Sequence, residues 1–408
     1  MSKYTMQYPI WDKETRANPQ AMYEQMRNEA PIFHEIGPQT GRGFWFFTRY
    51  EDCVAVLKDQ RFGKEFWKHL EPELIAMQPG GNGTDGNVFD AINRHMLNLD
   101  PPDHTRLRFL VHKAFTPRMI DNLRPRIQEI ANDLINEMKG KTEIDLLADF
   151  GFPLPITVIA EMLGVPAADR NKFRDWTRAL LFGMSEADSM TAVMEFMMYM
   201  HNMIDERRET PRDDVLSALV NAEEAGDKLD RQELLSMIFL LLVAGHETTV
   251  NLIGNGTLAL MQNPDQMQKL RANPQLIGSA VEEMLRYNGP VETPTTRWAF
   301  EDVVINGVTI PKGDLVMPSL LGANRDPAVF ENPNTFDITR DPNRHIAFGS
   351  GIHFCLGAPL ARMEGAIAIN TLLGSVAHIE LACPVDSLEW NDQLLLHGMK
   401  ALPVTIGQ

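Results

Sequence analysis

The chain has 408 residues, 44% of them hydrophobic, so it is long enough to bury a large core. Its 38 basic and 55 acidic residues leave a net charge of −17, which argues against binding to nucleic acid or to anionic membranes. Its three cysteines, at positions 53, 355 and 383, are too few and too widely spaced for a disulfide framework and indicate a reducing cytoplasm.

The N-terminal 20 residues contain no apolar core of the kind found in secretory signals. The longest uninterrupted apolar run, residues 237–244, is far shorter than the ~20 residues that a membrane-spanning helix needs. We therefore expect a soluble, cytoplasmic protein.

The N-terminal part of the chain alternates between helical and strand patterns. Residues 18–30 have a helical pattern, and the aromatic-rich runs 32–36 and 44–48 predict a hairpin. Helical spacing returns at 50–60. The Gly-rich stretch 78–88 is not followed by Gly-Lys-Ser/Thr, so it is not a phosphate-binding loop, and we expect a long loop that covers a binding site.

A helix is predicted to begin near Asp103, after two prolines, and to end by Pro117. His104 and Arg108 are four residues apart in it and share one face. On their own, these two residues could equally form a solvated basic surface.

Residues 121–260 have an almost wholly helical pattern, and 231–262 form the longest helical run. The pattern is broken near Gly140, 151–155, 164–166, Pro211 and Gly226. His246 and Glu247 begin the H-E-x-x-H pattern of zinc proteases, but Val250 stands where the second histidine is required. A zinc-protease site is therefore excluded.

Five methionines crowd one part of this helical region, which is typical of a pliable pocket, although an ordinary core explains them equally well. They are Met194, Met197, Met198, Met200 and Met203.

A further helix is predicted at 274–287, with Glu283 and Arg286 three residues apart on one face. Such pairs also occur on many solvated helices. Strands follow around 303–310 and 315–318, and the chain ends in a region of strands and turns.

Residues 348–364 read FGSGIHFCLGAPLARME and place Cys355 in a glycine-rich loop just before a helix that begins near Ala358. A cysteine binds metal only as a thiolate, and the positive end of a helix stabilises that charge. The alternative for a lone intracellular cysteine is a buried free thiol.

The spacing of Phe348, Gly351, His353, Cys355 and Gly357 resembles the haem-binding loop of the cytochrome P-450 family. Three further family motifs occur in the family order, and the resemblance covers nearly the whole chain. It implies a mainly α fold with small β-sheets, forming one large catalytic domain over residues 1–408. It also implies a haem b cofactor whose iron has Cys355 as its only protein ligand.

The resemblance assigns further residues to the cofactor. The haem propionates would be bound by cationic side chains, and the helix that crosses above the haem would carry the family's A-G-x-E-T element. The implied cofactor-binding residues are His104, Arg108, Arg297, His353, Cys355, Ala244, Gly245 and Phe348.

The A-G-x-E-T element also implies two catalytic residues. Reduction of dioxygen consumes protons, which requires a hydroxyl, on Thr248, and a carboxyl, on Glu247, to relay them from water. Gly245 would leave room for a ligand against the helix. A helical threonine bonded back to its own helix is the alternative for Thr248.

Other positions follow from the same resemblance. Arg340 would join the E-x-x-R pair and support the cysteine loop. Val291 and Pro294 would face the substrate cavity, the loop 394–398 would close the cavity, and the methionine-rich stretch would lie over it.

The implied reaction inserts one oxygen atom of dioxygen into a C–H bond of a small hydrophobic molecule, with electrons from NAD(P)H delivered by a ferredoxin and its reductase. The candidate substrates are polyketides and macrolides, fatty acyl chains, steroids and terpenoids, and the protein is expected to be a monomer. A peroxide-driven peroxygenase and a non-enzymatic haem sensor or electron carrier remain alternatives.

The electron donor is expected to dock on a local basic patch on the otherwise acidic surface. Arg106 and Lys113, on a face distinct from that of His104 and Arg108, are predicted to point outward. By analogy with the family, this patch comprises Arg106, Lys113, Arg344 and Arg362.

Overall fold

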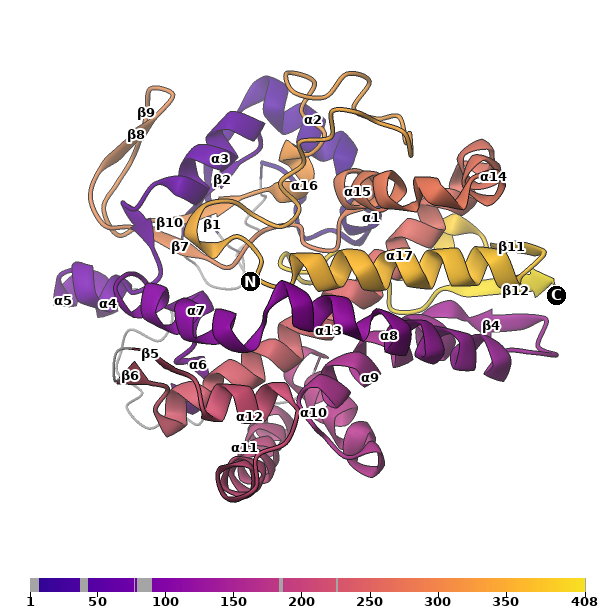
Figure 1. The fold of residues 1–408 in the computed structure, drawn as a ribbon. Coiled ribbons are helices and arrows are strands. Elements are labelled where there is room, and N and C mark those ends of the chain that lie inside the picture. Colours follow the sequence, from indigo (N-terminus) through magenta and orange to yellow (C-terminus); the bar gives the residue numbers. More distant parts are fainter. Residues whose placement is uncertain are drawn as a thin grey trace. The chain divides into compact units, whose positions relative to one another are not determined.

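The computed structural model describes residues 7–36, 43–76, 78, 90–182, 186–224 and 227–407 (Figure 1). Apart from Gln78, the loop predicted at 78–88 lies outside these residues. The chain divides into two compact units. The first comprises Met1–Leu70, Gln128–Phe152 and Thr248–Gln408, and the second comprises Glu71–Ile127 and Pro153–Glu247.

The first unit contains a five-stranded sheet in the order β1-β2-β10-β7-β3. The predicted hairpin is confirmed, since β1 (Ile32–Ile36) pairs antiparallel with β2 (Gly43–Phe47). Parallel to β2 lies β10 (Leu315–Pro318), which the chain reaches only after more than 260 further residues. The sheet is completed by β7 (Arg297–Ala299) and β3 (Phe62–Gly63).

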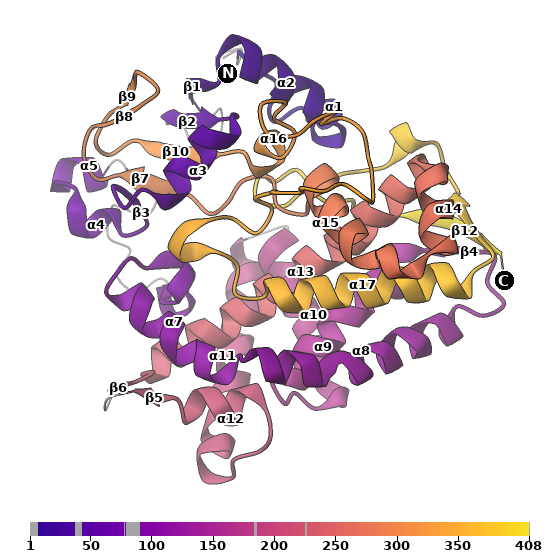
Figure 2. The same ribbon diagram turned by 45° about the horizontal axis from the view of Figure 1, so that its top comes forward.

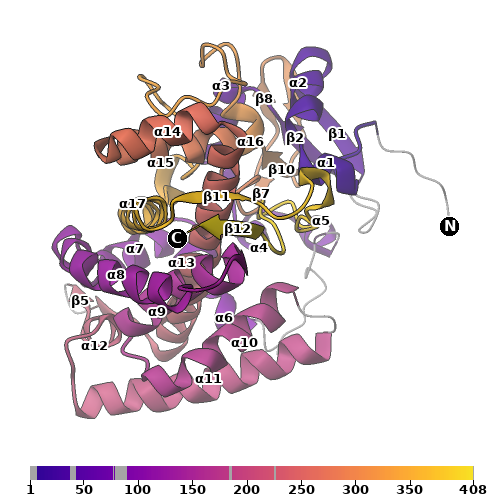
Figure 3. The same cartoon turned by 90° about the vertical axis from the view of Figure 1, so that its right-hand side faces the viewer.

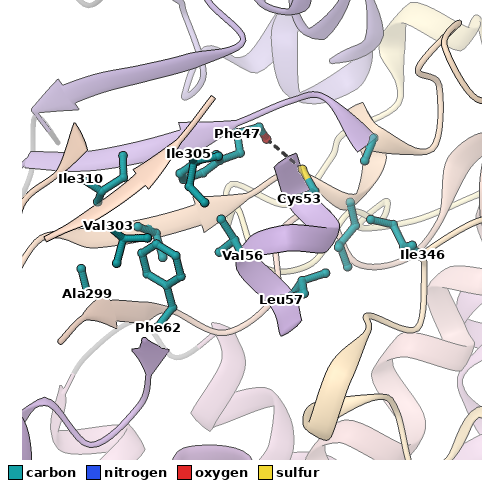
Figure 4. Close-up of a cluster of buried hydrophobic side chains, with 13 residues drawn as sticks. Phe47, Cys53, Val56, Leu57, Phe62, Ala299, Val303, Ile305, Ile310 and Ile346 are labelled. Atoms are coloured by element: carbon teal, nitrogen blue, oxygen red, sulfur yellow. Dashed lines mark hydrogen bonds between the residues drawn. The ribbon is translucent and has the colours of Figure 1, made fainter. Parts of the chain in front are cut away.

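One side of this sheet packs on α3 (Tyr50–Lys58), whose apolar residues form a buried cluster with residues of the strands (Figure 4). Cys53 is fully buried in this cluster, and its thiol donates to the backbone oxygen of Phe47 at 3.4 Å. Burial raises the pKa of Cys53 well above its usual value, so this cysteine stays a neutral thiol.

Two smaller sheets belong to the same unit. β8 (Val303–Ile305) and β9 (Val308–Ile310) form a hairpin, as expected from the strand pattern there. The other sheet has the order β11-β12-β4, with β11 at His378–Leu381, β12 at Pro403–Gly407 and β4 at Glu143–Asp145 (Figure 1). Figure 3 shows β11 and β12 from another side.

The strand β4 follows the predicted break near Gly140 in an otherwise helical region, but the sequence did not predict a strand there. Three residues are too few to show the alternation that marks a strand in sequence. They are extended because Val404 and its neighbours in β12 supply the hydrogen-bonding edge.

The helix predicted before the end of the chain is confirmed as α17 (Ala358–Ser375), and it packs against α15 (Ile277–Asn288) (Figure 2). The other helical elements of this unit are short. They are α1 (Lys13–Ala17), α2 (Gln20–Glu29), α4 (Phe66–His69), α14 (Pro264–Ala272), α16 (Leu320–Ala323), the π-helical η2 (Leu147–Gly151), and the 3-10 helices η4 (Pro274–Leu276), η5 (Gly351–His353) and η6 (Val385–Ser387).

The second unit is mainly helical. Its helix α10 (Arg170–Phe182) packs along α11 (Glu186–Glu209) through edge-to-face contacts between aromatic rings of the two helices. The helix predicted to begin near Asp103 is confirmed as α7 (Asp103–Ala114). The unit also contains α5 (Pro72–Ala76), α6 (Asp90–Asn93), η1 (Met96–Asn98), α9 (Pro153–Met162), η3 (Ala167–Asp169), α12 (Val215–Val220) and the two-residue strands β5 (Glu223–Glu224) and β6 (Asp227–Lys228).

Two long helices run from one unit into the other: α8 (Pro117–Glu137) and α13 (Arg231–Gln262). The bounds of α13 are those predicted from its apolar periodicity. By length and composition alone α13 could cross a membrane. The sequence did not predict this, because the longest uninterrupted apolar run in α13 has only eight residues. However, 67% of its most apolar window is buried inside the protein, as in a core helix.

In the first unit α17 crosses α13 closely. A side chain added at Gly365 would place its Cβ 2.9 Å from a methyl carbon of Leu252. Beside this contact the carboxyl of Glu364 is fully buried and hydrogen-bonded to the side chain of Thr249. Burial raises the pKa of Glu364 to about 8, so this carboxyl is protonated at neutral pH.

The replacement Glu364→Gln should therefore stabilise the protein at alkaline pH. In the unfolded chain Glu364 ionises near its ordinary pKa, whereas the folded protein holds the proton up to about pH 8. Stability is thus lost as the pH rises between these two values, by up to about 1.4 kcal/mol per pH unit.

Denaturant unfolding of both proteins from pH 4 to pH 9 measures this difference. The stability of the variant relative to the wild type should grow with pH up to about 8 and then stay constant. A difference that does not change with pH would show that Glu364 is ionised in the fold.

Candidate functional site

Cys355 lies between η5 and α17, with an exposed side chain, in the first unit. Its backbone N–H donates to the oxygen of Phe348 at 3.0 Å and closes the loop. Gly351 has a φ of 73°, and a Cβ there would lie 2.5 Å from the backbone oxygen of Leu57. Only glycine fits this position, because both the conformation and the close approach exclude a side chain.

The thiol sits at the positive end of an 18-residue helix. Gly357 is the N-cap of α17, and a Cβ added to it would lie 4.0 Å from Sγ of Cys355. The first turn of a helix presents unpaired N–H groups and favours negative charge. The predicted setting for a thiolate is therefore present, and the alternative of a buried free thiol is wrong.

The predicted E-x-x-R pair lies on α15 and is completely buried. Arg286 donates to Glu283 through Nε at 2.7 Å and through Nη2 at 2.8 Å. Arg340 joins them as predicted, with Nε 3.1 Å from one oxygen of Glu283 and 3.2 Å from the other. The same carboxylate accepts from the backbone N–H of Asp337 and from the side chain of Asn343.

The two arginines fasten the irregular stretch that precedes the cysteine loop. Arg286 donates to the backbone oxygens of Asn324 at 3.1 Å and Pro333 at 2.8 Å, and both arginines donate to Thr335 at 3.0 Å. The side chain of Asn324 in turn accepts from the N–H of Ile346 at 2.8 Å. This hydrogen-bonded chain leads from the buried carboxylate to within ten residues of Cys355 in sequence.

Replacing Glu283 with alanine should destabilise the first unit severely, because two guanidinium groups lose their common acceptor in a dry interior. Breaking a buried pair in this way costs about 3–5 kcal/mol. The measurement is urea unfolding followed by the fluorescence of the tryptophans.

The neighbouring residue on α15 provides the control. Glu282 is 28% exposed and binds Arg362 at 2.6 Å and His345 at 3.1 Å. Because solvent screens this site, Glu282→Ala should cost less than Glu283→Ala. Equal losses would contradict the structural role assigned to Glu283.

The four cations predicted to bind propionates are divided between the units. In the first unit, Arg297 is 3% exposed on β7, and His353 lies in η5, two residues before Cys355. In the second unit, His104 is 2% exposed on α7, and Arg108 is half-buried one turn further along. Because α7 is a regular helix, His104 and Arg108 are one turn apart and lie on the same face, as predicted.

Sequence reasoning missed a buried cation beside Arg297. The ammonium of Lys64 donates to the backbone oxygens of Thr295 and Thr296, both at 2.7 Å, and to the hydroxyl of Thr295 at 2.6 Å. It thereby fixes the segment that leads into Arg297. A single lysine between two aromatic runs carries no signal of this role.

The middle of α13 combines a buried helix with an accessible stripe. Ala244 is exposed and Thr248, one turn later, is half-buried, whereas the positions around them are mostly buried. A Cβ added at Gly245 would make only ordinary contacts, at 3.4 and 3.5 Å, with Ile159. The surrounding protein therefore does not require glycine at 245, which is consistent with space kept for a ligand.

Glu247 is mostly buried, and its carboxylate lies 3.7 Å from Nε2 of His246. This contact is not an ion pair at neutral pH, because burial lowers the pKa of His246 to about 4. The imidazole also forms a 2.8 Å hydrogen bond through Nδ1 to the oxygen of Leu242. His246 is thus a neutral core residue, in agreement with the exclusion of a zinc site.

The prediction of outward-pointing charges is wrong for Arg106. This guanidinium forms an ion pair with Glu233 of α13 and lies 3.5 Å from Asp227. Nothing in the sequence indicates that a glutamate 127 residues away faces it. Lys113 is exposed, and its ammonium lies 5.3 Å from the ring centre of Phe109.

Arg362 also has an acidic partner, and Arg344 is exposed. Arg362 binds both oxygens of Glu282, at 2.6 and 2.9 Å, and covers the ring of Phe348 at 4.5 Å. Although burial opposes the shift, Arg362 and His345 lower the pKa of Glu282 to about 2. The charge of Arg362 is therefore matched locally, so Arg362 does not add an unmatched charge to the predicted basic patch.

The five methionines do not form one face. Met194 and Met198 on α11 are 48% and 63% exposed, whereas Met200 and Met203 are buried in the core. The interpretation as ordinary core holds for the last two residues.

The candidate ligands suit a metal bound within an organic cofactor rather than a bare metal ion. Among the described residues, no group of three or more His, Cys, Asp or Glu side chains could hold a bare metal ion. One accessible cysteine at a helix N-terminus can supply a single axial thiolate, and a buried arginine such as Arg297 suits a carboxylate partner. These residues fit a haem.

Comparison with known proteins gives a consistent result. Residues 156–401 match the family model for cytochrome P450. The polyketide biosynthesis cytochrome P450 PksS of Bacillus subtilis is 46% identical over 97% of this chain and 98% of its own length, and its solved structure covers 98% of this chain with a TM-score of 0.90.

Two further relatives also match most of the chain. Cytochrome P450 CYP107DY1 of Priestia megaterium is 48% identical over 91% of this chain and 90% of its own length. The myxobacterial cytochrome P450 CYP267B1, solved in complex with myristic acid, is 46% identical, covers 98% of this chain and 99% of its own, and has a TM-score of 0.90.

Proposed function

Because the chain belongs to the cytochrome P450 family and is a P450 monooxygenase, we propose that it hydroxylates an unactivated C–H bond in a hydrophobic polyketide or fatty acyl chain. The accessible Cys355 at the start of α17 is the observation that carries this proposal. The substrate class is supported by PksS, named for polyketide biosynthesis, and by CYP267B1, solved with myristic acid.

The family implies a haem cofactor, and we assign its contacts to residues of this chain. When bound, the haem supplies the iron at which dioxygen is reduced and activated. Cys355 would ligate the iron, while Phe348 and the Ala244–Gly245 turn of α13 would contact the ring. The propionates would be held by His104, Arg108, Arg297 and His353.

Thr248 and Glu247 would deliver the protons that oxygen reduction consumes. The Thr248 hydroxyl stands on the accessible stripe of α13, and the Glu247 carboxyl precedes it by one residue. We propose that the carboxyl takes protons from water and that Oγ1 of Thr248 passes them on.

Electrons would come from NAD(P)H through a ferredoxin and a ferredoxin reductase, and the protein would act as a cytoplasmic monomer. The exposed Lys113 and Arg344 are candidates for contacts with an acidic donor. Consumption of NADPH that depends on both added partners and on the fatty acyl probe myristic acid tests this route. Product formed equally well from hydrogen peroxide, without partners, would favour the peroxygenase alternative.

Replacing Cys355 with alanine should abolish the red-shifted Soret band that carbon monoxide gives with a reduced, thiolate-ligated haem. Absorption spectroscopy of the purified, haem-reconstituted proteins measures this. Cys383→Ala is the matched control, because Cys383 is the other cysteine that is not fully buried. This variant should keep the band. A band that survives in the Cys355 variant would refute the assignment.

Replacing Thr248 with alanine should leave the carbon monoxide band intact but uncouple turnover, because the protons no longer reach the reduced oxygen in the productive order. Product per NADPH consumed should fall about tenfold or more, a smaller factor than the roughly 10²–10⁴-fold that a positioned acid–base group contributes. The released hydrogen peroxide is quantified in the same assay. Coupling equal to that of the wild type would remove Thr248 from the proton path.

A further inference from the structure

Two segments distant in sequence run side by side in the first unit, and we call them the paired wall: residues 290–296 and 391–397. The N–H of Glu292 donates to the oxygen of Leu395 at 3.1 Å, and that of Thr293 donates to Leu394 at 3.2 Å. The N–H of His397 donates back to Pro290 at 2.9 Å. These bonds join the two segments like strands of a sheet.

The side chains of the paired wall differ in burial. Glu292 is 0% exposed, and Leu394 packs with Tyr23 in the hydrophobic cluster of the N-terminal helices. Their neighbours differ, since Leu395 is 38% exposed and Pro294 is half-buried. Leu395 follows Leu394 directly in extended chain and therefore points to the opposite side, away from the N-terminal helices. The paired wall thus contacts the N-terminal helices through Glu292 and Leu394 and presents the apolar side chain of Leu395 away from them.

One guanidinium connects both segments of the wall. Arg16, in α1, is 2% exposed and forms an ion pair with the carboxylate of Glu292. Its Nη2 donates to the oxygen of Gln393 at 2.7 Å, and its Nε lies 3.4 Å from the oxygen of Asn391. A planar guanidinium with its donors in a fixed fork sets the distance between its acceptors.

A second buried group shares the same carboxylate. The hydroxyl of Tyr23, on α2, donates to the other oxygen of Glu292, and its ring stacks on Phe46 with 6.0 Å between the centroids. Burial raises the pKa of Glu292, and the guanidinium of Arg16 opposes this shift. Glu292 is thus held from both sides by residues more than 260 positions earlier in the chain.

We propose that Arg16, through Glu292 and the carbonyl oxygens of residues 391 and 393, is a positioning residue that sets the spacing of the paired wall and thereby selects long apolar substrates. This inference rests on the proposed function and on the expectation, implied by the family resemblance, that Val291, Pro294 and the loop 394–398 face the substrate. It adds that the N-terminal helix α1 determines the shape of that surface without touching the substrate.

The test uses two ligands that coordinate haem iron and are followed by their spectral shift. Imidazole is too small to reach a cavity wall, whereas N-dodecylimidazole carries an apolar chain that must pack against it. Arg16→Met should weaken binding of N-dodecylimidazole at least fivefold and leave binding of imidazole within twofold. Tyr23→Phe, a milder change that keeps the ring, should shift the ratio of the two affinities in the same direction.

A merely structural role is separated by two controls. Arg207→Met removes an equally buried arginine, which binds Asp214 at 2.6 Å in the second unit, and it should leave the ratio of the two affinities unchanged. The double variant Arg16→Met with Glu292→Gln removes the unpaired charge. It should regain thermal stability but not the affinity for the long chain, because the connection to residues 391 and 393 is still missing.

The proposal is overturned if both ligands weaken equally in Arg16→Met, if neither changes, or if the double variant regains both stability and affinity. Failure of the proposed function looks different. In that case the wild-type protein itself would bind neither imidazole nor carbon monoxide with the spectrum of a thiolate-ligated haem.

Discussion

The structure around the cysteine loop depends first on one buried carboxylate, that of Glu283. It neutralises Arg286 and Arg340 at once, in an interior where each unpaired charge would cost several kcal/mol. The remaining donors of the two arginines bind backbone oxygens of a stretch that has no helix or strand of its own. That stretch needs such partners, because its backbone groups are not satisfied by regular structure. The position of the cysteine loop follows from it.

The same device occurs a second time in the first unit. Glu292 is buried and paired with Arg16, and the other N–H groups of this arginine again donate to backbone oxygens of an irregular segment. In both places a planar guanidinium converts one ion pair into a defined separation between stretches of loop. One site supports the loop that carries Cys355, and the other supports the proposed substrate surface. The regular helices and sheets then provide the rigid frame to which these loops are fastened.

Local and periodic features could be predicted from the sequence. The bounds of α13, the start of α7 and the helix after Cys355 follow from apolar spacing and from proline and glycine positions. The contact between Arg340 and Glu283 was predicted from the resemblance to a family motif. Contacts between distant charged residues could not be predicted, because no local pattern distinguishes a paired residue from a solvated one.

Arg106 illustrates this limit, since its partner Glu233 lies 127 residues away and on another helix. The strand β4 is a second case, because its three residues are extended only by pairing with the C-terminal strand β12. Glu364 is a third, because a carboxyl within an apolar helical run carries no sign that it is protonated. In each case the tertiary surroundings, rather than the local sequence, decide the outcome.

The central claim is that Cys355, presented by this loop, ligates the iron of a haem. X-ray absorption at the iron edge of the purified protein tests it most directly, because the extended fine structure reports the elements bound to iron. The account predicts one sulfur neighbour together with the ring nitrogens, and the loss of that sulfur in Cys355→Ala. An iron surrounded only by nitrogen or oxygen in the wild-type protein would contradict the account.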